Sequence, residues 1–144
     1  MVDREIWKTP CRLEIKQPFH IDDDAVASHL YRIAREAVIN ANKHAQAREI
    51  VVRLARSQKG TVLTVTDNGV GLPSTLNSAR GLGFHIMKYR ARAIGGRLEI
   101  ERPKKGGTRV ACYLPNKAIQ SQKKENIRPR LFPAKIAKTF AALI

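Results

Sequence analysis

Cysteines, aromatic residues and long apolar runs are scarce in this sequence of 144 residues. Its two cysteines, Cys11 and Cys112, are too few and too far apart for a zinc-binding pattern, so we expect small buried thiols in a reducing compartment. No run approaches the roughly 18 apolar residues that span a bilayer, and the N-terminal segment lacks the apolar stretch of a signal peptide. We therefore expect a soluble, cytoplasmic protein.

Acidic residues are also few, with 12 Asp and Glu against 27 Lys and Arg, and the formal net charge is +15. Residues 1–115 hold 20 of the basic and 11 of the acidic residues, whereas residues 116–144 hold 7 and 1. A field of this sign attracts DNA, RNA, acidic membranes and nucleotide phosphates alike, so charge does not choose among them. A non-catalytic nucleic-acid-binding module is one alternative, but aromatic residues make up only 6% of the chain and form no stacking platform.

The two most familiar nucleotide-binding motifs are absent as well. No G-x-x-x-x-G-K-[ST] phosphate loop occurs, and the string from Arg80 to Gly83 lacks the third glycine of the dinucleotide fingerprint because Ile86 stands in its place. Gly81 and Gly83 nevertheless lead directly into an expected helix, where free backbone N–H groups can bind an anion. The sequence therefore keeps a phosphate-binding signal without either common fold.

The hydrophobic pattern predicts helices and strands in a definite order. Strands are expected over residues 11–17, 48–57, 61–67, 97–103 and 108–115, and helices from the acidic residues 22–24 to Ala45 and over residues 81–94. This order favours an α+β fold, a two-layer α/β sandwich in which helices cover one face of a mixed, mostly antiparallel sheet. In the second helix the expected packing positions are Ile86, Tyr89, Ala93 and Ile94.

The chain divides into two parts by composition. Residues 1–115 are expected to form one domain. Residues 116–135 are polar and basic with two prolines, and we expect residues 116–144 to form a basic, flexible tail.

Four polar side chains share one stripe of the first helix. On a helical wheel Glu36, Asn40, Lys43 and His44 fall within about 100° of arc, along the edge of the apolar face. A carboxylate and an amide one turn apart can hold Mg²⁺ and its waters, and an ammonium group one turn further can reach phosphate oxygens. A charge pair between Glu36 and Lys43 on a surface helix is an equally good interpretation of this pattern.

Asp67 ends an apolar strand and is followed closely by Gly69 and Gly71. A carboxylate in this place can accept a hydrogen bond from an exocyclic amine, and the glycines let the backbone approach a ligand. Asp-Asn-Gly is also ordinary turn chemistry, and this segment taken alone favours the turn.

Four blocks, residues 35–45, 67–73, 80–96 and 106–110, follow one another along the chain. Together they resemble the N box, the two glycine boxes and the terminal Gly-Thr element of the ATP-binding domain of sensor histidine kinases, within the GHKL ATPase superfamily. The resemblance extends over residues 11–115. It implies an α/β sandwich that holds Mg-ATP between its helices under a mobile lid formed by residues 72–80.

The resemblance also implies roles for the polar stripe of the first helix. Asn40 would be the Mg²⁺ ligand, and Glu36 would order the waters of the metal or assist phosphoryl transfer. The phosphates would be contacted by Lys43 and His44 and, at the hinge of the lid, by Gly81 and Gly83.

The remaining implied residues surround the base. Asp67 would bind the adenine amino group, Gly69 and Gly71 would shape that wall, and Thr108 would line the base pocket. ATP and Mg²⁺ are thus the expected ligands.

A complete sensor kinase also has a helical dimerisation domain with a phosphoacceptor histidine. The histidines of this sequence are His20, His29, His44 and His85, and none precedes the ATP-binding segment on a helical hairpin. The resemblance therefore implies transfer of the γ-phosphoryl group to a histidine on a separate dimerisation domain, with a response regulator downstream. A GHKL kinase of the anti-sigma type, which phosphorylates a serine of its partner, is the closest alternative.

Overall fold

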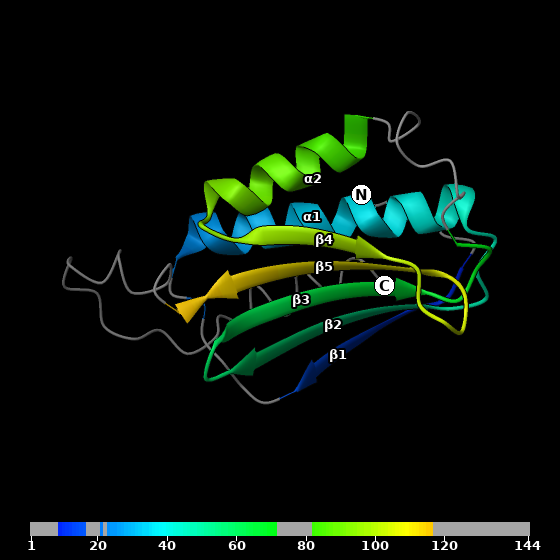
Figure 1. The fold of residues 1–144 in the computed structure, drawn as a ribbon, viewed down its shortest axis with the longest axis horizontal. Helices are drawn as coiled ribbons and strands as arrows, with labels where there is room; N and C mark the ends of the chain where they lie inside the picture. The colour runs from blue at the N-terminus through cyan, green and yellow to red at the C-terminus, as the bar shows by residue number, and fades with distance from the viewer. Residues whose placement is uncertain (1–8, 17–20, 22, 72–81, 117–144) are drawn as a thin grey trace.

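A computed structural model describes residues 9–16, 21, 23–71 and 82–116, which form a sheet and a layer of helices (Figure 1). The elements in chain order are β1 (Cys11–Lys16), α1 (Asp24–His44), β2 (Ile50–Ser57), β3 (Gly60–Asp67), α2 (Leu82–Ala93), β4 (Arg97–Glu101) and β5 (Thr108–Pro115). The strand order is β1-β2-β3-β5-β4, in which β1 runs parallel to β2 and the other neighbours are antiparallel. Both helices cover the same face of the sheet, which confirms the predicted α+β fold.

Some predictions fall outside the described residues. The expected lid, Gly81 and the chain beyond Asn116 are among them. In the part that the structure describes, neither helix is long and apolar enough to cross a membrane.

Buried and more exposed side chains alternate along the strands, so one face of the sheet packs against the helices. In β3, Leu63 and Val65 are buried in the core with 1% and 3% of their surface exposed. Leu63 lies opposite Cys112 of β5, and burial raises the pKa of the Cys112 thiol to about 11. The prediction of a buried thiol is thus confirmed for Cys112, whereas Cys11 on β1 is only partly buried.

Helix α1 begins where the acidic residues predicted a helix start. Asp23 is the N-cap, and its Oδ1 accepts hydrogen bonds from the backbone N–H groups of Ala25 at 2.7 Å and Val26 at 3.2 Å. The apolar side chains at helical spacing are buried: Val26, Ala27, Leu30, Ile33, Ala34, Ala37, Val38 and Ala41. The long helix predicted from this spacing is therefore confirmed.

Helix α2 turns a different face to the core from the one expected. Ile94, just after the helix, is buried as predicted, but Ile86 and Tyr89 are 38% and 71% exposed, and the buried positions of the helix are Met87 and Ala91. At about 100° per residue, Met87 and Ala91 lie nearly opposite Ile86 and Tyr89 on the helical wheel. The segment therefore carries two apolar stripes on opposite sides, and the prediction chose the wrong one for Ile86, Tyr89 and Ala93.

Thr61 gives a stability test of this core. Its side chain is 1% exposed, and Oγ1 has no hydrogen-bond partner among the described residues. A buried hydroxyl without a partner lowers stability, so Thr61→Val, which keeps the β-branched shape, is expected to raise the free energy of unfolding by about 1 kcal/mol. Urea unfolding measures this. Thr64→Val, on the half-buried opposite face, is the control and should change little. An unchanged or lower midpoint for Thr61→Val would contradict the assignment.

Candidate functional site

Several segments meet at one end of the sheet, on the right in Figure 1. The end of β3 and the start of β5 lie side by side, because Asp67 pairs with Thr108 in the register of these strands. The loop after β3 is joined to the C-terminal end of α1, since the N–H of Val70 donates to the carbonyl oxygen of Ala45 at 2.7 Å. The elements that carry most of the predicted site residues are thus brought together.

Backbone packs on backbone at this end of the sheet. A Cβ at Gly69 would lie 2.0 Å from the carbonyl oxygen of Ala45, and one at Gly107 would lie 1.9 Å from that of Asp67. Gly107 also has a φ of +79°, in the left-handed region that favours glycine. The loops therefore need glycine here, and Gly71, which packs near the carbonyl of Gly107, belongs to the same wall.

Asp67 is the buried carboxyl group of the site, with 6% of its surface exposed. Burial raises its pKa, while hydrogen bonds from the backbone N–H groups of Gly69 and Thr108 act in the opposite direction. The bond from Gly69 to Oδ1 measures 2.9 Å, so the turn interpretation of Asp-Asn-Gly is also correct. A carboxylate has about four acceptor positions, and capacity therefore remains for a ligand amine.

Glu36 lies directly against the first turn of α2. A Cβ at Gly83 would come within 2.3 Å of Glu36 Oε1, so the missing side chain at Gly83 makes room for this carboxylate. Asn40, one turn further along α1, is partly buried, and Lys43 and His44 are exposed in the last turn. Within the described residues Glu36 makes no ion pair with Lys43, which removes the support for a structural charge pair.

The donor set on α1 fits a magnesium ion that is shared with phosphates. Glu36 and Asn40 offer the oxygen ligands that Mg²⁺ prefers. In the described part of the chain, no three His, Cys, Asp or Glu side chains gather into a metal site. Because Mg²⁺ in nucleotide sites is held by one or two protein ligands together with phosphates and water, such a gathering is not needed here.

Asn68 has a structural role that the sequence analysis missed. Its Oδ1 accepts hydrogen bonds from the backbone N–H groups of Arg48 at 2.9 Å and Glu49 at 3.0 Å. These two N–H groups are therefore hydrogen-bonded to a side chain instead of a neighbouring strand, and β2 starts at Ile50 rather than at the predicted residue 48. Asn68 thereby fastens the loop beside Asp67, and the only sequence signal was its place in the Asp-Asn-Gly turn.

Comparisons with known proteins agree on one relationship. Residues 25–118 match the sequence profile of a family described as histidine kinase-, DNA gyrase B- and HSP90-like ATPase. The chain is 38% identical over 111 residues to the nitrate/nitrite sensor protein NarX of Escherichia coli (strain K12), which covers 76% of the chain and 19% of NarX. It is 33% identical over 121 residues to the sensor histidine kinase LiaS of Bacillus subtilis (strain 168), covering 78% of the chain and 33% of LiaS. The chain thus spans about a fifth of the length of NarX and a third of LiaS.

Solved structures share the fold. The histidine kinase domain of a blue-light activated kinase from Erythrobacter litoralis superposes with a TM-score of 0.60 at 22% identity, covering 82% of this chain and 57% of that one. The ATP-binding domain of PrrB from Mycobacterium tuberculosis gives a TM-score of 0.59 at 24% identity, covering 74% of this chain and 79% of that domain.

The raised pKa of Asp67 predicts a pH-dependent stability difference. Below the ordinary value of 3.8 the carboxyl is protonated in both the folded and the unfolded chain, so its charge has no effect. As the pH rises through the raised pKa, the folded chain must hold a buried charge and loses stability. Asp67→Asn keeps the acceptor for Gly69 without the charge. Its gain in unfolding free energy over the unsubstituted chain should be larger at pH 7 than at pH 3, measured by urea unfolding, and a pH-independent difference would contradict this.

Proposed function

This chain belongs to the family of histidine kinase-, DNA gyrase B- and HSP90-like ATPases, in which it is the ATP-binding catalytic domain of a sensor histidine kinase. We propose that it transfers the γ-phosphoryl group of Mg-ATP to a histidine on a separate dimerisation domain. One observation carries the proposed reaction. Buried Asp67 ends β3 beside the C-terminal end of α1, the same half of the helix that holds Glu36 and Asn40. In this proposal a carboxyl group for the base and oxygen donors for the metal form one site.

Asp67 binds the base in this proposal. It accepts a hydrogen bond from the adenine amino group, and its two backbone hydrogen bonds hold the carboxyl in place for that contact. Thr108, its partner across the strands, lines the base pocket. Gly69 and Gly71 form the wall beside the base, since side chains there would collide with neighbouring backbone.

The phosphates lie along α1 towards α2. Asn40 would hold the Mg²⁺ ion as a ligand, and Glu36 would order the waters of the metal. A metal ion held there would supply charge neutralisation for the phosphate oxygens. The phosphate contacts come from Lys43, His44, Gly81 and Gly83.

The transfer itself requires little covalent chemistry from the protein. A nitrogen of the acceptor imidazole bonds to the γ-phosphorus, the bond from phosphorus to the bridging oxygen breaks, and ADP leaves. The imidazole loses one proton, which Glu36 takes directly or through water. Glu36 lies against the first turn of α2, the helix on which we place the acceptor domain below.

The exposed face of α2 is a suitable surface for the acceptor domain. Leu82, Ile86 and Tyr89 are 74%, 38% and 71% exposed, and exposed Ala93 continues their spacing of four, three and four residues. That spacing is the one by which helices pack along a seam. The helix contains no Asp or Glu, and its cations are Lys88, Arg90 and Arg92. A helix of the histidine-bearing domain with acidic flanks would fit this face, and a response regulator would then take the phosphoryl group from the histidine.

We also place the end of the domain near Pro115. Strand β5 ends there, and the family match ends at residue 118. The basic residues that follow would form a separate tail.

Asn40→Ala tests the metal assignment. The variant should lose Mg-dependent ATP affinity by about 100-fold, because an oxygen ligand to a charged centre is removed. Calorimetric titration with and without Mg²⁺ measures it, and circular dichroism checks the fold. Gln58→Ala removes an exposed amide from the turn at the other end of the sheet and is the matched control. An unchanged Mg-dependent ATP affinity in a folded Asn40→Ala variant would contradict the assignment of Asn40 as the metal ligand.

The double variant Ile86→Ser with Tyr89→Ser tests the docking face. ATP affinity should stay unchanged, while transfer to an added histidine-bearing dimerisation domain should fall by about tenfold or more, because exposed apolar contacts are lost. The readout is acid-labile phosphate on that domain. Ile15→Ser is the control, since Ile15 is also 38% exposed but lies on β1. Equal transfer by the double variant would reject this face, and acid-stable phosphate on a serine would favour the serine-kinase alternative.

A further inference from the structure

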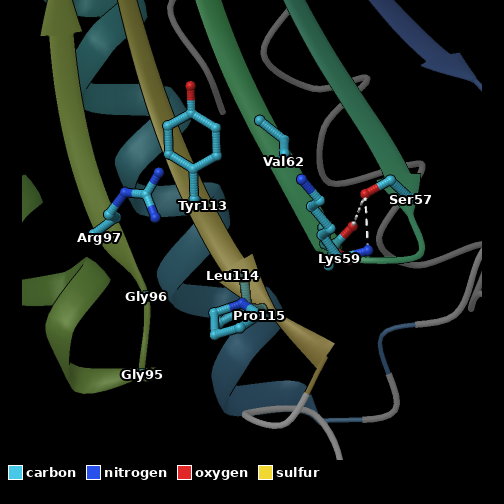
Figure 2. Close-up of a pocket in the computed structure, with 11 residues that line it drawn as sticks. Ser57, Lys59, Val62, Gly95, Gly96, Arg97, Tyr113, Leu114 and Pro115 are labelled. Carbon is cyan, nitrogen blue, oxygen red and sulfur yellow. Dashed lines mark hydrogen bonds between the residues drawn. The ribbon is translucent and has the colours of Figure 1, made fainter.

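A hollow lies at the end of the sheet opposite the candidate nucleotide site. It has a volume of about 430 Å³ and is formed where the β2–β3 turn, the α2–β4 turn and the end of β5 meet. Among its lining residues are Lys59, Val62, Gly96, Arg97, Tyr113 and Pro115 (Figure 2). We call it the distal groove. The length of β3, about 23 Å from Gly60 to Asp67, separates it from the nucleotide site.

The rim of the distal groove is fixed by backbone contacts. A Cβ at Gly60 would lie 2.1 Å from the carbonyl oxygen of Leu114, and one at Gly96 would lie 2.6 Å from that of Tyr113. Both turns therefore pack directly on the backbone of β5. The hydroxyl of Ser57 further holds the β2–β3 turn, because it accepts the N–H of Lys59 at 3.2 Å. The packing of these two turns on β5 therefore sets the shape of the distal groove.

The chemistry of the distal groove is cationic and apolar. Figure 2 shows Lys59 and Arg97 on opposite sides of Tyr113. Lys59 makes no ion pair with any described residue. Arg97 forms an ion pair through its Nε with Glu99 at 2.9 Å, and its guanidinium carbon lies 4.5 Å from the centre of the Tyr113 ring. No Asp or Glu is among the lining residues, whereas Val62, Tyr113, Leu114 and Pro115 supply apolar surface.

We propose that the distal groove is a binding site for a small organic anion, an aromatic carboxylate in chemical class. The carboxylate would pair with Lys59 and Arg97, and the ring would lie on the apolar lining beside Tyr113. The volume is in the range of small-molecule sites. Residues 117–144, which follow the last described residue, Asn116, carry 7 Lys and Arg against 1 Glu, so their charge does not match the cations of the groove.

Benzoate is the probe, titrated into the full isotope-labelled chain and followed by the backbone amide signals. The expected result is saturable shifts at Gly60, Gly95 and Gly96, the glycines of the groove, without shifts at Gly69, Gly71 and Gly107 of the nucleotide site. Benzamide, the neutral analogue, and acetate, which lacks the ring, should each bind at least about tenfold more weakly.

Two charge-neutralising variants complete the test. Lys59→Gln and Arg97→Gln should each weaken benzoate binding by about tenfold and leave Mg-ATP affinity unchanged, which separates this proposal from the kinase assignment. Lys104→Gln, in the turn between β4 and β5, is the control and should bind benzoate normally. The proposal is overturned if benzoate causes no saturable glycine shifts, if benzamide or acetate binds equally well, or if both variants bind like the control.

Discussion

The pairing of β3 with β5 places Asp67 directly opposite Thr108, and the positions of the other candidate site residues depend on that register. A shift by one residue would turn Leu63 and Val65 out of the core, so apolar burial along the whole strand holds the register. The same pairing brings Gly107 against the carbonyl of Asp67, an approach that leaves no room for a side chain. Core packing in the middle of the sheet thus fixes a carboxyl group at its end.

Helix α1 couples that core to the polar side of the site. Its apolar stripe is buried against the sheet, while Glu36 and Asn40 lie along the edge of the stripe and are only partly buried. The helix end is tied to the loop after β3 through Ala45 and Val70. A change in the position of α1 would therefore move the proposed metal ligands and the proposed wall of the base pocket together, which would link stability to nucleotide binding.

The elements that carry the candidate site were predictable from local patterns, because each pattern involves only residues that are close in the sequence. The acidic N-cap, the helical spacing of α1 and the apolar strand that ends at Asp67 each involve only neighbouring residues. Other features required contacts between distant segments. Asn68 shortens β2 from 20 residues away, and Gly83 matters because Glu36 occupies the space a side chain would take. Helical and strand periodicity do not predict contacts between residues so far apart in the sequence.

The sequence by itself determined the order of helices and strands, the α+β class and the polar blocks that resemble a histidine kinase ATP-binding domain. Helical and strand periodicity, caps and turns are local properties, because each depends on residues that are close together in the sequence. Only the tertiary structure decided which apolar stripe of α2 faces the core, since Met87 and Ala91 are buried while Ile86 and Tyr89 on the opposite side are not. Both stripes satisfy the same periodicity, and the choice between them depends on the shape of the surface formed by α1 and β4, which residues far away in the chain create.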